Sequence, residues 1–80
     1  MRFGAPTKRS VTIAGHETSI ALEALFWQAL ERAASDDALP LNALIARIDA
    51  ARIEARPPPN LASAIRQWLL ERALADRGGE

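Results

Sequence analysis

The side chains that could support catalysis or bind a metal are few and scattered in this 80-residue chain. His16 is the only histidine, cysteine is absent, and Ser19 and Ser63 have no nearby base with a residue to orient it. Nucleophilic catalysis requires such a base and orienting group, and a structural zinc site requires several Cys or His ligands. The sequence therefore predicts no enzyme activity, no metal site and no cofactor, with His16 a solvated turn residue.

The most regularly spaced polar side chains lie on a short strand. In the segment 17–22, Thr18, Ile20 and Leu22 alternate with three smaller or more polar residues. Because successive strand residues point to opposite faces, one face is apolar and the other offers hydrogen-bonding groups. The residues expected on that second, outward face are Glu17, Ser19 and Ala21. The strand runs directly into a helix, so its backbone groups must pair with another strand, either of this chain or of a second copy.

A second alternating run, residues 10–14, precedes this strand, and two arrangements accommodate it. A two-residue type II′ turn at Gly15-His16 would form a hairpin, pairing Ile13 with Thr18. A bulge at Gly15 would instead leave one long kinked strand. We favour the hairpin and keep the bulge open. In the hairpin, Ser10 and Thr12 share the outward face and Arg9 lies near its rim.

Three helices are expected after the strand, over Glu23–Ser35, Leu41–Ala55 and Leu61–Ala75. Each shows apolar residues at helical spacing, and Phe26 and Leu30 lie on the inward stripe of the first helix. Trp27 lies off that stripe, so it either packs against the third helix or a second copy, or is an exposed anchor for a partner. Pro57-Pro58-Pro59 forms a stiff corner, and Asn60 is suited to cap the third helix.

Size and composition limit the protein class. The chain has 49% hydrophobic residues and a net charge of +0, which is typical of a single globular domain and not of a strongly basic nucleic-acid binder. A domain of this size gains only about 3–5 kcal/mol from its core and usually needs a further source of stability. Because disulfides and metals are excluded, oligomerisation is the source that remains. We expect a flexible basic arm over residues 1–7, a domain over 8–76 and a frayed end over 77–80.

Nothing in the sequence indicates a membrane protein. No apolar run approaches the roughly 18 residues of a transmembrane helix. The first six residues lack the apolar core of a signal peptide. We therefore expect no membrane partner and a cytoplasmic location.

A β element followed by two helices in a chain expected to oligomerise resembles the ribbon-helix-helix (Arc/MetJ-like) proteins. The chain is more closely similar to a bacterial subfamily with an added N-terminal strand and a third helix. The resemblance covers about residues 8–70, and its motifs are Lys8-Arg9-Ser10-Val11-Thr12, Gly15-His16, Thr18-Ser19, Leu22-Glu23, Phe26-Trp27, Leu41-Asn42, Ile48-Asp49 and Asn60-Leu61-Ala62-Ser63-Ala64.

The resemblance implies a mainly helical, intertwined homodimer that inserts an antiparallel ribbon into the major groove of double-stranded DNA. The base-facing positions it implies are Glu17, Ser19, Ala21, Ser10 and Thr12. The phosphate contacts it implies are Lys8, Arg9, Leu41 and Asn42. The dimer core it implies consists of Ile20, Leu22, Phe26, Leu30, Leu44, Ile45 and Ile48.

Two functions remain open. The first is a dimeric DNA-binding transcriptional regulator. The second is a ribbon-helix-helix dimer that serves as a protein interaction module, antitoxin-like or scaffold, with weak or no DNA binding. Two residues on the outward strand face favour the interaction module. The Glu17 carboxylate repels phosphate, and Ala21 can contact little beyond a thymine methyl. Pro40 stands where the family usually carries a capping Ser or Thr.

Overall fold

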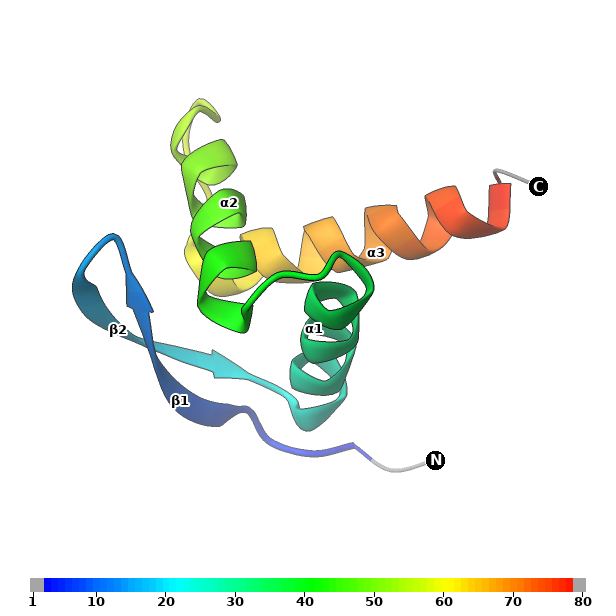
Figure 1. Cartoon of the computed structure of the whole chain (residues 1–80), viewed down its shortest axis with the longest axis horizontal. Coiled ribbons are helices and arrows are strands. Elements are labelled where there is room, and N and C mark those ends of the chain that lie inside the picture. Colours follow the sequence, from blue (N-terminus) through cyan, green and yellow to red (C-terminus); the bar gives the residue numbers. More distant parts are fainter. Residues whose placement is uncertain (1–2, 79–80) are drawn as a thin grey trace.

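The computed structural model describes residues 3–78, which form a β-hairpin packed against three helices (Figure 1). The elements are β1 (Thr7–Ile13), β2 (His16–Leu22), α1 (Ala24–Asp36), α2 (Leu41–Ile53) and α3 (Leu61–Gly78). The expected strand, hairpin and three helices are therefore confirmed, with helix boundaries within three residues of those expected. Residues 1–2 of the expected basic arm and 79–80 of the expected frayed end lie outside the described residues.

The hairpin turn lies one residue earlier than the sequence indicated. Ala14 and Gly15 form the turn, with φ of 50° and 82°, and two positive φ values define a type I′ rather than a type II′ turn. Ile13 consequently pairs with His16 and not with Thr18. The two registers differ by two residues, so the faces of both strands are unchanged and only the cross-strand partners are corrected.

Pairing within the chain also alters the expected origin of the ribbon. β1 and β2 are antiparallel neighbours in a two-stranded sheet, so one edge of β2 is satisfied by β1 of the same chain. A second copy is therefore not needed to give this strand a partner.

The core lies between the inner face of the hairpin and the three helices. Leu22, Leu30 and Ile45 are each fully enclosed. On α1 the buried aromatic residue is Trp27, 3% exposed, whereas Phe26 is only half-buried. Phe26 nevertheless packs against the core, as its place on the inward stripe predicts, and the buried surface of α1 is wider than the sequence indicated because it also includes Trp27. The complete buried set is Val11, Ile20, Leu22, Trp27, Leu30, Ala33, Ala34, Leu44, Ile45, Ile48, Ile65 and Leu69.

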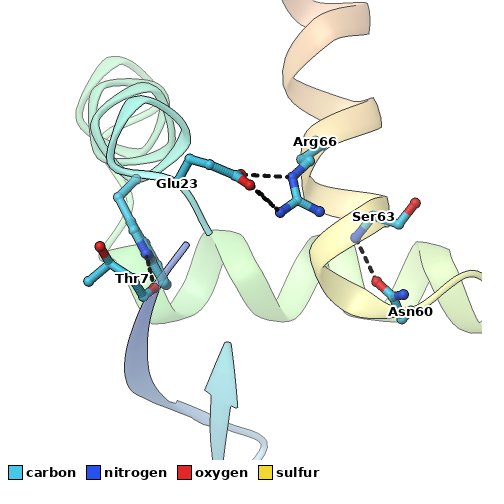
Figure 2. A network of polar contacts seen from close by, with 6 residues as sticks. Thr7, Glu23, Asn60, Ser63 and Arg66 are labelled. Carbon is cyan, nitrogen blue, oxygen red and sulfur yellow. Dashed lines mark hydrogen bonds and ion pairs between the residues drawn. The ribbon is translucent and has the colours of Figure 1, made fainter. Parts of the chain in front are cut away.

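Local interactions fix where α2 ends and α3 begins. Asn60 caps α3 as expected, because its side-chain oxygen accepts a hydrogen bond of 2.8 Å from the Ser63 amide (Figure 2). Arg52 joins the two helices by donating to Asp49 at 2.9 Å and to the Pro59 carbonyl at 3.1 Å. The i,i+3 pair expected at Asp49 and Arg52 is thus present and also holds the proline corner.

Two ion pairs attach α3 to the ends of α1. Arg66 binds the Glu23 carboxylate at 2.9 Å where α1 begins, and Arg72 binds Asp37 at 2.7 Å just beyond its end. Figure 2 shows the Glu23 carboxylate and the Arg66 guanidinium facing each other across the two elements. Among residues 3–78, no helix combines the length and hydrophobicity that crossing a lipid bilayer requires.

Candidate nucleic-acid interface

The outward face of the hairpin collects the polar strand residues of both β1 and β2. Ser10 lies directly opposite Ser19, Thr12 opposite Glu17, and Lys8 opposite Ala21. Five of these side chains are exposed and Ala21 is partly exposed. Because alternate strand residues share a face, the register brings all the expected base-facing residues onto one surface, which we call the ribbon face: Lys8, Ser10, Thr12, Glu17, Ser19 and Ala21.

The chemistry of the ribbon face is that of small hydrogen-bonding groups. The hydroxyls of Ser10, Ser19 and Thr12 both donate and accept, whereas the ionised Glu17 carboxylate only accepts. Lys8 and Glu17 carry opposite charges, so the net formal charge of the face is zero. Such a surface favours specific hydrogen bonds over general attraction to an anionic partner.

Arg9 lies on the opposite face from Lys8. Its guanidinium stacks over the Trp27 ring at 4.5 Å from the ring centroid and approaches the Glu31 carboxylate to 3.4 Å. The side chain is 40% exposed. Arg9 is thus engaged by α1 beneath the strand, and its predicted phosphate contact would compete with Glu31.

Trp27 anchors β1 to α1, an interaction that the sequence did not indicate. Its indole Nε1 donates a hydrogen bond of 2.8 Å to the carbonyl oxygen of Thr7, the first residue of β1. Trp27 is therefore packed within its own chain and attached to the hairpin, and the alternative of an exposed anchor is wrong. The position of Trp27 off the apolar stripe of α1 was the available signal.

The beginning of α2 offers unpaired amides. Pro40 precedes the helix and provides no side-chain cap, and its carbonyl accepts from the amides of Ala43 and Leu44 at 3.0 and 3.1 Å. Within residues 3–78, the amides of Leu41 and Asn42 donate to no protein acceptor. Free N-terminal amides, together with the helix dipole, can bind an anionic group such as phosphate.

The electrostatics around α1 are dominated by paired charges. Bonding to a backbone amide and to the Arg66 guanidinium holds the pKa of the Glu23 carboxyl below its ordinary value. The hydrogen bond from Arg72 likewise lowers the pKa of the Asp37 carboxyl. Within the described chain, the arginines engaged in ion pairs are Arg9, Arg52, Arg66 and Arg72. None of these arginines belongs to the ribbon face, on which Lys8 is the one cation.

The residues expected in a dimer core are mostly enclosed within one chain. Six of them are at most 4% exposed and Phe26 is half-buried; the six are Ile20, Leu22, Leu30, Leu44, Ile45 and Ile48. Their contact with a second copy stays a prediction and would require the chain to rearrange. His16 is exposed as expected, but it is the first residue of β2 and not part of the turn. No group of three or more potential metal ligands occurs within residues 3–78.

A family model described as "Ribbon-helix-helix domain" matches residues 6–73, which include the hairpin, α1, α2 and most of α3. No curated protein and no solved structure matches the chain.

Proposed function

The chain belongs to the ribbon-helix-helix family, whose domains are in general DNA-binding regulators, and we propose that it is itself a dimeric DNA-binding transcriptional regulator. The observation that supports this most directly is the exposed ribbon face, on which the hydroxyls of Ser10 and Ser19 lie opposite each other. Each chain carries a complete two-stranded ribbon for insertion into the major groove.

The dimensions of the hairpin are compatible with that insertion. Paired strands lie about 4.8 Å apart. The major groove is about 12 Å wide and admits a two-stranded ribbon. In this arrangement the hydroxyls of Ser10, Thr12 and Ser19 bond to base edges, Glu17 accepts from a cytosine amino group, and Ala21 contacts a thymine methyl.

Phosphate contacts come from the borders of the ribbon. Lys8 supplies a cation on the ribbon face, and the free amides of Leu41 and Asn42 supply a clamp at the start of α2. Arg9 joins them only where phosphate displaces it from Glu31. This small number of cations predicts modest affinity for a single ribbon, so a dimer on a palindromic site is needed for stable binding.

The test is selection of bound fragments from a random duplex library, followed by salt titration of the best binder. We expect an enriched palindromic motif. Lys8→Ala should weaken binding to every sequence and reduce the slope of log K against log salt by about 0.9 for each phosphate that Lys8 neutralises. Ser19→Ala should change the preferred bases more than the affinity, whereas Ser35→Ala, at an exposed serine on α1, should change neither. Absence of any enriched motif would contradict the proposal.

The second candidate, a protein interaction module, is favoured by the zero net charge of the ribbon face. Under this function ribbon-face substitutions leave partner capture intact, and selection yields only unspecific DNA binding that disappears at physiological salt. Substitutions on α3 then abolish partner capture.

A further inference from the structure

A hollow lies where the turn end of the hairpin meets the last turns of α2 and the start of α3. It has a volume of about 420 Å³, within the range of about 300–1,000 Å³ that small-molecule sites occupy. Its apolar lining includes Ile13 and Leu61, and its charged or amide side chains are Asp49, Arg52 and Asn60. We call this site the turn hollow. A concave surface with a few polar groups on apolar walls is typical of a ligand site.

The charges of the turn hollow are balanced within the chain. Every guanidinium nitrogen of Arg52 is bonded: Nε and Nη2 lie 2.9 and 2.8 Å from Asp49 Oδ1, and Nη1 donates to the Pro59 carbonyl at 3.1 Å. Both side chains of this ion pair are at most 24% exposed. The other titratable side chain of the hollow is His16, which is exposed to solvent. Because the Asp49–Arg52 pair has no net charge, the hollow favours an uncharged ligand over an ion.

Asp49 and Asn60 each present one polar atom that bonds to no group within residues 3–78. Arg52 binds Asp49 through Oδ1, which leaves Oδ2 as an acceptor. Asn60 Oδ1 accepts from the Ser63 amide at 2.8 Å, so the Asn60 Nδ2 remains as a donor. Figure 2 shows this nitrogen on the side of Asn60 away from the Ser63 amide. The existing bonds thus hold a carboxylate acceptor and an amide donor in fixed orientations at one hollow.

We propose that the turn hollow binds a small uncharged molecule that carries an N–H donor beside a carbonyl-type acceptor on an apolar body. Primary amides and nucleobases have such an edge. The donor of the ligand bonds to Asp49 Oδ2, its acceptor bonds to Asn60 Nδ2, and its apolar body covers Ile13 and Leu61. Hydrogen bonds to an ionised carboxylate are stronger than those between neutral groups, so the donor contributes most to the selection of the ligand.

The turn hollow is connected to the ribbon face through β2. Glu17 belongs to the ribbon face and lies between His16 and Thr18, which both line the hollow. A bound molecule contacts the hairpin together with α2 and α3, and it therefore fixes the position of the ribbon relative to the helices. The effect of the ligand on DNA binding rests on the proposed regulator function, whereas the ligand site itself does not.

Titration of the full chain with benzamide, followed by two-dimensional proton–nitrogen NMR, tests the site. We expect saturable shifts of the backbone amides of Ala14, Thr18 and Leu61, with a dissociation constant in the millimolar range typical of so small a ligand. N,N-dimethylbenzamide lacks the donor, and benzoate carries an anion in place of the uncharged edge, so each should bind about tenfold more weakly. Equal or tighter binding of either compound, or the absence of saturable shifts at the hollow, would overturn the assignment.

Asn60→Asp removes the donor and keeps the helix cap, because aspartate caps helices about as well as asparagine does. We expect benzamide to bind this variant about tenfold more weakly, with helix content by circular dichroism unchanged. Asn60→Ser keeps the cap without adding a charge and should weaken binding in the same way. The matched control is Gln28→Glu, the same amide-to-carboxylate change at an exposed residue of α1 outside the hollow. Wild-type affinity in both Asn60 variants, or an equal loss in the control, would refute the role of Asn60.

The titration contains no DNA, so its outcome is independent of the proposed function. A protein that binds benzamide at the turn hollow but selects no DNA motif retains the ligand site and loses the regulator function. A protein that selects a motif but shows no saturable benzamide shifts does the reverse. Where both hold, saturating benzamide should change the affinity of the wild type for the selected motif and leave that of Asn60→Asp unchanged. An equal response of the two proteins would refute the connection between the hollow and the ribbon face.

Discussion

Trp27→Phe should destabilise β1 more than the rest of the chain. The substitution keeps an aromatic ring beneath Arg9 but removes the Nε1 donor that lies 2.8 Å from the Thr7 carbonyl. Loss of this hydrogen bond should cost about 1 kcal/mol in the free energy of unfolding. The space that the smaller ring leaves at a site only 3% exposed should cost about 1 kcal/mol more.

The expected total is about 2 kcal/mol, which corresponds to a fall in Tm of about 8–16 °C for a domain of this size. Urea denaturation followed by circular dichroism measures the free energy. Hydrogen exchange of backbone amides then locates the effect, and the amides of β1 should lose protection before those of α3. Ribbon-face function should decline with them, because Lys8 and Ser10 belong to β1.

Trp68→Phe is the matched control. Trp68 also stacks under an arginine, with Arg72 at 5.3 Å from its ring centroid, but it is only half-buried and its indole donates to no group within residues 3–78. The reasoning fails if the two substitutions cost the same within about 0.5 kcal/mol. It also fails if β1 retains its amide protection in Trp27→Phe.

Two further predictions concern the turn and the surface ion pairs. Ala14→Asn should stabilise the hairpin by about 0.5–1 kcal/mol, because asparagine tolerates the positive φ at this position. Gly15→Ala, at a φ of 82°, should destabilise the hairpin by about 1 kcal/mol. Thermal melts of both variants check whether Tm rises in the first and falls in the second. Stability should fall in acid, because Glu23 and Asp37 have lowered pKa values in the folded state, so the unfolded chain takes up protons first as the pH falls through about 4. The stabilisation is complete above that pH and is lost as the pH drops towards the lowered values. Asp37→Asn should flatten the pH dependence of Tm in this window, and an unchanged dependence would refute the contribution of the Arg72 pair.

Local patterns were sufficient to predict the elements and the outward face of the hairpin. Helical spacing located α1, α2 and α3, and Asn60 indicated where the last of them begins. Strand alternation assigned Ser10 and Ser19 to the same outward face, and it did so before the register was known. These features depend on the chemistry of neighbouring residues, which the sequence contains in full.

Tertiary structure decided the register of the hairpin and the groups that the side chains of Arg9 and Trp27 contact. Registers that differ by two residues bury the same side chains, so alternation cannot distinguish them. The hydrogen bond from Trp27 to the Thr7 carbonyl is formed in the register that pairs Ile13 with His16. The turn hollow likewise arises only when Ile13, Asp49 and Asn60, distant in sequence, are placed around one site. The sequence by itself determined which faces of the strands and helices are apolar or polar, because this periodicity depends only on neighbouring residues. The packing of distant elements decided which of these faces contact one another and which stay exposed to a partner.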